Sequence, residues 1–198
     1  MVGNLLGDFV KGRKQLEKLP LNIQNGIILH RKIDAFTDQH KMVKQSIQRL
    51  KPTQKRYASV VSDIFYDYFL SKNWKTYTSL EIQTFANQTY QHLEKNYEFM
   101  SERPLMIYKK MIAANWLIDY GSYEKIDFVM GKLSDRIKNP NNLHNAIKDL
   151  KEHEIGLNED FKNKLLRSGD NFYCTNGHPQ HYTRKKSLQK KLTNALRE

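Results

Sequence analysis

Apolar residues recur every three or four positions along most of the chain, which is the spacing of an amphipathic α-helix. The clearest such segment begins near Pro20 and carries Ile23 and Ile27 on one side as far as Asp38. We find no run that alternates strictly between polar and apolar residues, as a half-buried strand would. The pattern therefore predicts an all-α fold, a single helical bundle without internal repeats.

Caps and turn residues divide the rest of the pattern into further helices. We expect helices over 40–50 (ended by the residues KPT), over 55–74, from Thr78 or Ser79 to about Met100, from Pro104 to Gly121, from Ser122 to 137, and from about Pro140 to Leu166. Beyond this point turn residues, aromatics and histidines mix without a clear period. We therefore expect a helical domain over 1–168 and a basic, irregular tail over 169–198.

Composition narrows the class of protein. The 198 residues carry a net charge of +12 and a single cysteine, Cys174, which rules out an intrachain disulfide and fits a reducing compartment. Cys174, His178 and His181 give only three ligands at a spacing of no common zinc site, so we expect none there. With no signal peptide and no run of 18 apolar residues, we expect a cytoplasmic protein that does not enter a membrane.

One short stretch, HRKIDAFTD, places His30, Asp34 and Asp38 at steps of four residues. Four residues turn an α-helix by about 400°, so the three side chains share one face. That face lies on or beside the apolar side that carries Ile23 and Ile27. The row is either a set of metal ligands or an ordinary helix surface in which Arg31 pairs with Asp34.

Three more aspartates lie in apolar settings. Asp63 and Asp67 fall within the apolar arc of the 55–74 segment, and Asp8 precedes Lys11 and Lys14 together with Arg13. Burying carboxylates is costly unless something pairs with them. Taken singly, each could be solvated or part of an ion pair. Together they indicate a divalent cation, Mn²⁺ or Mg²⁺, with the basic residues holding phosphate oxygens.

These segments together resemble a known family. GNLLGDFVKG, GIILHRKIDAFTD, DIFYDYFLSKNW and NWLIDYGSYEKIDFVMGKLSDRI, in this order and spacing, are similar to the acyl-carrier-protein phosphodiesterase family over about residues 3–137. The resemblance implies an all-helical, distorted relative of the HD phosphohydrolase fold in a cytoplasmic, Mn²⁺-dependent enzyme. The implied reaction is hydrolysis of the phosphodiester that joins 4′-phosphopantetheine to a serine of the holo-carrier protein.

The resemblance also implies roles for particular residues. Asp8, His30, Asp34 and Asp67 would bind the metal ion, with Asp63 as a further candidate. Asp38 would be a ligand or a base that orients water, while Arg31, which matches a basic family pair with Lys32, would neutralise the phosphate. Carrier proteins are strongly acidic, so a chain of charge +12 would attract them.

The chain departs from the family pattern in two places. A short histidine-containing segment expected before GNLLGDF is not present, and Tyr68 stands where some relatives have histidine. If that missing segment supplies a ligand, we expect weak metal binding. Two other functions remain open: an HD-type nucleotide phosphohydrolase, and a non-catalytic basic helical module that binds nucleic acid. The latter leaves the aligned aspartates unexplained, so nucleic acid is not the expected partner.

Overall fold

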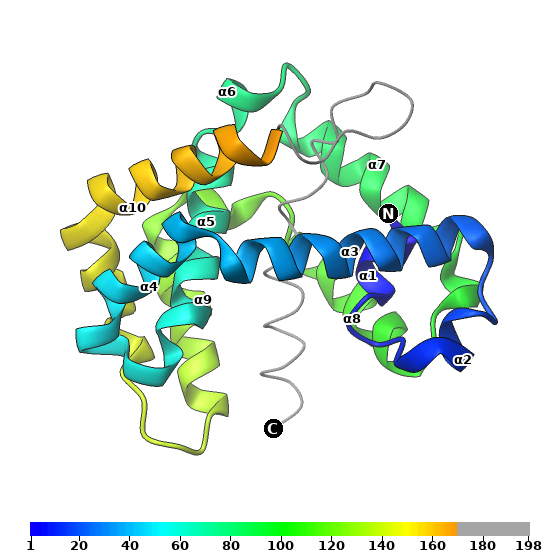
Figure 1. Ribbon diagram of the computed structural model, residues 1–198, viewed down its shortest axis with the longest axis horizontal. Helices are drawn as coiled ribbons and strands as arrows, with labels where there is room; N and C mark the ends of the chain where they lie inside the picture. Colours follow the sequence, from blue (N-terminus) through cyan, green and yellow to red (C-terminus); the bar gives the residue numbers. More distant parts are fainter. Residues whose placement is uncertain (170–198) are drawn as a thin grey trace.

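The computed structural model describes residues 1–169, and within this range it contains helices and no strand (Figure 1). The α-helices are α1 (Val2–Leu6), α2 (Gly12–Leu16), α3 (Leu21–Gln39), α4 (Lys41–Gln54), α5 (Ala58–Lys72), α6 (Trp74–Tyr77), α7 (Ile82–Glu94), α8 (Glu102–Ala113), α9 (Tyr123–Arg136) and α10 (Ala146–Gly169). The predicted all-α fold is confirmed for this part of the chain. Its relation to HD phosphohydrolases stays a prediction.

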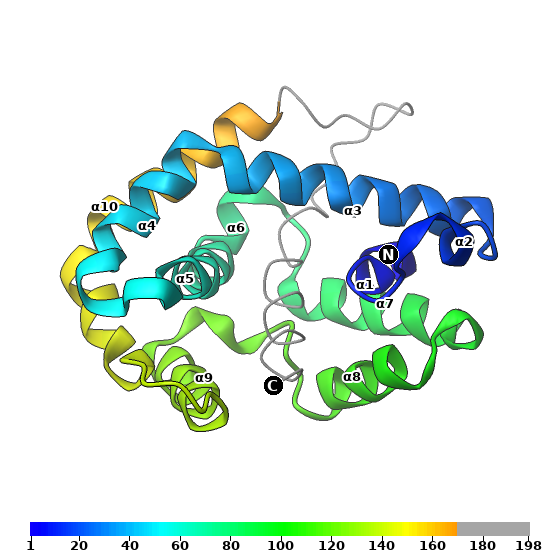
Figure 2. The ribbon, with the colours of Figure 1, turned by 60° about the horizontal axis from the view of Figure 1, so that its bottom comes forward.

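Two hydrophobic cores lie side by side (Figure 2). The larger core is formed mainly by α4, α5, α9 and α10, and the smaller one by α1, α3, α7 and α8. In the view of Figure 2, α3 runs along one side from the smaller core to the start of α4. The long helix α3 therefore joins the two halves of the bundle.

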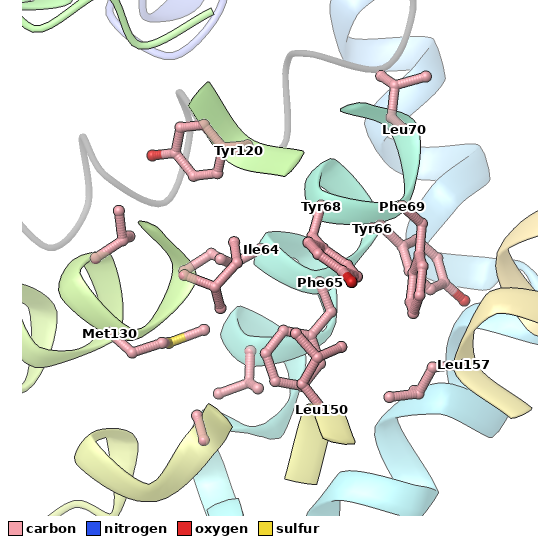
Figure 3. Packing of buried hydrophobic residues seen from close by; sticks show 14 of the residues in the cluster. Ile64, Phe65, Tyr66, Tyr68, Phe69, Leu70, Tyr120, Met130, Leu150 and Leu157 are labelled. Atoms are coloured by element: carbon pink, nitrogen blue, oxygen red, sulfur yellow. The ribbon is translucent and has the colours of Figure 1, made fainter. Parts of the chain in front are cut away.

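The central helix of the larger core is α5, which is buried on nearly all sides (Figure 3). Phe65 and Phe69 are fully buried, and Phe69 lies against Phe161 of α10 with ring centroids 5.9 Å apart. A helix that is apolar all round must be enclosed by its neighbours. Asp63 and Asp67 are nevertheless buried on this helix, at 7% and 6% exposure, as the sequence pattern predicted.

Buried polar contacts attach α10 to α4. Asp160, which is 2% exposed, accepts hydrogen bonds from the Ser46 hydroxyl at 3.0 Å and from Arg49 Nε at 3.2 Å. At the end of α4, Asp149 accepts hydrogen bonds from Thr53 and Gln54 at 2.9 and 2.6 Å. Because unpaired buried carboxylates are costly, these contacts fix the register of α10 on α4.

Glu154 gathers polar groups from two other helices. Its carboxylate accepts hydrogen bonds from Tyr68 at 2.9 Å, Tyr123 at 2.6 Å and Lys72 at 2.6 Å. Burial raises the pKa of Glu154, but the bonds from Lys72 and the two tyrosines outweigh it, so the pKa is lowered overall. Burial, followed by the bond to Glu154, raises the pKa of Tyr68 to about 12. The cluster joins α5, α9 and α10.

Two predicted helix ends near Pro52 and Trp74 differ from the structure. The residues KPT do not end α4, which continues through Pro52 to Gln54. Proline removes one backbone hydrogen bond, but the Thr53 hydroxyl bonds to the Leu50 carbonyl at 3.1 Å and supports this turn. The 55–74 segment divides instead, since α5 ends at Lys72, where Asn73 bonds back to the Phe69 carbonyl.

The next two predicted helices are shorter than expected. The Thr78 hydroxyl accepts from Leu80 N–H in a local turn, so α7 begins only at Ile82, and it ends at Glu94 rather than Met100. The helix from Glu102 ends at Ala113, before Asn115 adopts a positive φ of 46°. A left-handed residue breaks the helix and lets the following segment turn into the core.

The start of α9 agrees with the prediction, whereas α10 begins later than the expected position near Pro140. Ser122 caps α9 by accepting a hydrogen bond from Lys125 N–H at 3.2 Å, as predicted. The last helix, α10, begins at Ala146, after a short 3₁₀ turn over Leu143–Asn145. None of the helices in the described range is both long and apolar enough to cross a membrane. Cys174, His178, His181 and the predicted tail beyond Gly169 lie outside the described residues.

The Glu154 cluster predicts a pH-dependent stability difference. At pH 7, Glu154→Gln should lower the free energy of unfolding by about 1–2 kcal/mol, because a neutral amide bonds Lys72 less strongly than a carboxylate does. A lowered pKa stabilises the fold above the ordinary carboxyl pKa, and this gain is lost as the pH falls through the folded-state value. Urea titrations should therefore show the two proteins converging at acidic pH.

The matched control for this experiment is Glu152→Gln, two residues away on α10 with its side chain 71% exposed. It should unfold like the wild type throughout the pH range. Equal destabilisation by both variants would contradict the role given to Glu154.

Candidate metal centre

The candidate site forms where α1 lies against α3. Gly3 of α1 faces Gly26 of α3, and a Cβ atom built on Gly3 would lie 2.4 Å from the Ile23 carbonyl oxygen and 2.7 Å from the Gly26 Cα. No side chain fits at these distances. The two glycines therefore let the backbones touch, which places the end of α1 beside the middle of α3.

One turn later, Gly7 packs against the imidazole ring of His30. A Cβ atom on Gly7 would lie 2.2 Å from His30 Cδ2 and 2.5 Å from Cγ, so only glycine leaves room for the ring. His30 is 1% exposed, and its Nδ1 makes no hydrogen bond with any described residue. The ring is thus oriented by packing, whereas metal-binding histidines usually donate this N–H to a fixed acceptor.

Three predicted ligands meet at this point. His30 Nε2 lies 3.1 Å from Asp34 Oδ2 and 3.4 Å from Asp8 Oδ1. One ligand atom from each of the three residues lies within 4.8 Å of the others, and no other described group of histidine, cysteine and acidic side chains comes together in this way. Asp34 reaches the site from one turn beyond His30, and Asp8 reaches it from the segment that follows α1.

The electrostatics of His30 reflect two opposed effects. Burial disfavours the charged ring and lowers the pKa of His30, but the carboxylates of Asp34 and Asp8 outweigh it and raise the pKa overall. Although both carboxylates are close, Nε2 makes no hydrogen bond of acceptable geometry with any described residue. The His30 nitrogen and the two carboxylates therefore form a place where a cation could bind between the three groups.

The spacing of these atoms fits a small divalent cation. Neighbouring ligands of an octahedral ion with bonds of about 2.1 Å lie about 3 Å apart. The separations of 3.1 and 3.4 Å from Nε2 are close to this value. Two carboxylates and one imidazole form a donor set for a hard or borderline ion such as Mg²⁺ or Mn²⁺. The residues present therefore fit a metal ion without rearrangement of the backbone.

Arg31 holds the segment that carries Asp8. Its Nη2 donates a hydrogen bond to the Val10 carbonyl oxygen at 2.8 Å, which joins the chain after α1 to the exposed side of α3. The basic residues that follow, Lys11 and Lys14 with Arg13 between them, are exposed at and within α2. Arg13 forms an ion pair with Glu17 at 2.6 Å.

Other candidates from the sequence lie apart from the three-residue group. Asp38 is exposed one turn beyond Asp34, and Asp67 is buried on α5. Neither contributes an atom to the group within 4.8 Å. Asp67 lies near Tyr120, since burial and then the charge of Asp67 raise the pKa of Tyr120. His40 caps α4, where its Nδ1 accepts a hydrogen bond from Met42 N–H at 3.2 Å.

Sequence reasoning missed the residues that assemble the site. Gly3 and Gly7 belong to the motif around Asp8 but drew no prediction of their own, and neither did Gly26. Their signal was present, because Gly3 and Gly7 are four residues apart and so face the same side of a helix. Small residues at this spacing often mark the close approach of another backbone.

The chain is similar to known proteins over most of its length. The sequence matches the family described as acyl carrier protein phosphodiesterase over residues 1–166. The chain belongs to this family. Proteins named acyl carrier protein phosphodiesterase from Photorhabdus laumondii and Klebsiella pneumoniae strain 342 are 26% and 28% identical to it, over 88% and 80% of this chain and 90% and 82% of their own lengths. No solved structure matches the chain.

Membership of this phosphodiesterase family explains why the sequence patterns occur together. The matched region contains α1, α3 and nearly all of α10, so it includes all three residues of the candidate site. It ends a few residues before the limit of the described chain.

The contact between Gly7 and His30 yields a first prediction for this site. Gly7→Ala should weaken Mn²⁺ binding about tenfold or more, because the added methyl group must displace the imidazole. Isothermal titration calorimetry would measure the Mn²⁺ affinity of the wild type and of each variant. Gly131→Ala is a matched control, since its Cβ would meet nothing closer than His144 Nδ1 at 3.8 Å. Equal affinities in the wild type and the Gly7 variant would contradict the role of this contact.

The two carboxylates yield a second prediction, on the ionisation of His30. In metal-free protein, an NMR titration should give His30 a pKa above 6.5. Asp34→Asn should lower this pKa, because only the Asp8 carboxylate then opposes the effect of burial. A raised pKa stabilises the fold below the ordinary value, and this gain disappears as the pH rises through the folded-state pKa. A His30 pKa that Asp34→Asn leaves unchanged would show that the pair is not coupled.

Proposed function

We propose that this protein hydrolyses the phosphodiester between 4′-phosphopantetheine and a serine of holo-acyl carrier protein, and that it requires a divalent metal ion, with Mn²⁺ as the expected one. The observation that carries the proposal is the convergence of Asp8, His30 and Asp34 at the contact between α1 and α3. Family membership supports the substrate, since the matched relatives are named acyl carrier protein phosphodiesterase.

The three residues would hold the metal ion through His30 Nε2 and one carboxylate oxygen each from Asp8 and Asp34. A bound divalent ion would polarise a phosphoryl oxygen and lower the pKa of water at the site. The protein supplies a rigid arrangement for this chemistry. His30 is fixed by Gly7, and Asp8 is held close to α3 through the bond between Arg31 and Val10.

Two exposed residues of α3, Arg31 and Asp38, would act on the substrate. Arg31 carries five N–H donors, one of which bonds the Val10 carbonyl, and the others would bind phosphate oxygens and neutralise their charge. Asp38, on the next turn after Asp34, would orient the attacking water or accept its proton. Asp67 remains a predicted fourth ligand, and its buried position on α5 makes Asp67→Asn an informative variant.

A mass-shift assay tests the proposed reaction. Holo-acyl carrier protein, incubated with the protein and Mn²⁺, should lose the mass of phosphopantetheine, and a chelator should prevent this loss. Asp34→Ala should lower the rate about 100-fold or more, because it removes a ligand rather than an outer contact. Asp127→Ala, an exposed aspartate on α9, is the matched control and should retain the wild-type rate.

Each alternative function gives a different result in the same assay. A nucleotide phosphohydrolase would release phosphate from nucleoside phosphates and leave the carrier protein unchanged. A binding module would show no metal-dependent turnover of either substrate. A folded, Mn²⁺-loaded protein that does not change the mass of holo-carrier protein would contradict the proposed reaction.

A further inference from the structure

The proposed reaction, on which this inference rests, places a strict condition on the bound partner. The scissile phosphorus is attached to a serine side chain, so only three single bonds, each of about 1.5 Å, separate it from a backbone Cα of the carrier protein. The folded surface of that protein must therefore cover the residues next to the metal centre. A docking surface elsewhere on the molecule could not by itself bring the bond to Asp8, His30 and Asp34.

The residues beside the metal centre are strongly basic. From 9 to 33 the sequence contains six lysines and arginines and a single acidic residue, Glu17. The bond between Arg31 and the Val10 carbonyl brings Lys11, the next residue, alongside the exposed side of α3. Lys14 follows one turn later, and both lysines are exposed. The positive charges of Lys11 and Lys14 therefore lie within a few residues of Asp8 in the sequence.

An apolar stripe adjoins this basic region on the outer side of α3. Leu21 and Ile28 are 71% and 39% exposed, although they are large aliphatic residues. They are seven residues apart, so they lie on one line along the helix, about 60° around the axis from Arg31. An exposed apolar residue beside several cations suits a partner whose acidic surface also exposes aliphatic side chains.

We propose that Lys11, Lys14, Ile28 and Arg31 form the docking surface for the carrier protein, with the acidic surface around its modified serine as the occupant. The lysines attract the acidic partner and orient it, and Ile28 provides an apolar contact. Arg31 lies at the junction of the docking surface and the metal centre. Because these charges are exposed, salt screens them, and the KM for the carrier protein rises with ionic strength.

A second exposed patch provides a comparison. On α9, Phe128 is 60% exposed, and the Nζ atoms of Lys125 and Lys132 lie 6.0 and 5.7 Å from the centre of its ring. This patch lies on the exposed side of α9, a helix of the larger core that is across the molecule from α2 in Figure 2. It has a similar chemical character but does not border Asp8, His30 or Asp34, so it serves as the control surface.

Steady-state kinetics of the Mn²⁺-loaded full chain with holo-acyl carrier protein test this assignment. Lys11→Glu/Lys14→Glu should raise KM about tenfold or more, since charge reversal repels the acidic partner. The control Lys125→Glu/Lys132→Glu changes net charge by the same amount on the α9 patch and should leave KM close to wild type. Ile28→Asp tests the apolar contact and should raise KM as well.

The outcomes separate the docking surface from the reaction itself. If the wild type turns over the carrier protein but both double variants raise KM equally, the effect is one of net charge and the proposed surface is wrong. An unchanged KM in the Lys11/Lys14 variant would also show that the surface is wrong. If the wild type removes no phosphopantetheine at all, the proposed function fails first, and the docking surface is rejected with it. Circular dichroism of each variant verifies that the helical fold is retained.

Discussion

The contact between the backbones of α1 and α3 is the constraint on which the candidate site depends. Gly3 and Gly26 remove the side chains that would hold the helices apart, and Gly7 leaves the space that the His30 ring fills. Asp8 comes from the segment after α1, whereas His30 and Asp34 come from α3, so this contact, together with the bond from Arg31 to the Val10 carbonyl, brings the three together. A modest increase in the distance between the helices would disperse the ligands.

The site differs from the contact between α4 and α10 in how its polar groups are satisfied. There, the buried Asp160 carboxylate is paired with Ser46 and Arg49. At the site, His30 Nε2 lies between two carboxylates without a hydrogen bond to any described residue. Charges repel more strongly in the low dielectric of a buried site, so two neighbouring carboxylates are costly there unless a proton or a metal ion lies between them and His30. The smaller core supports α3, because Ile23 and Ile27 of this helix are buried there beside residues of α1.

Much of the fold could be predicted from the sequence because its cause is local. The period of apolar residues predicts the helical class and the extent of α3, and cap and turn residues predict the start of α9 at Ser122. The helix ends at Gln54, Glu94 and Ala113 were predicted wrongly, because they depend on contacts made after folding. Thr53, for example, supports the turn that contains Pro52, and its own partner Asp149 is distant in sequence.

The site shows the same division between local and long-range causes. The four-residue step from His30 to Asp34 is a property of one helix and was visible in the sequence. Asp8 was a candidate ligand because of its apolar setting and the family resemblance. The glycine contact that brings Asp8 to His30 and Asp34 could be seen only in the three-dimensional structure. The roles of Asp38 and Asp67 depend on where substrate and metal bind, and they remain predictions.

The most direct test of the central claim, that α1 and α3 together form a divalent-metal centre, is anomalous X-ray diffraction from crystals of the full chain grown with Mn²⁺. We expect a manganese peak bonded to His30 Nε2 and to carboxylate oxygens of Asp8 and Asp34, with α1 and α3 in contact at Gly3 and Gly26. A fully occupied peak at other residues, or no peak from protein saturated with Mn²⁺, would contradict the account.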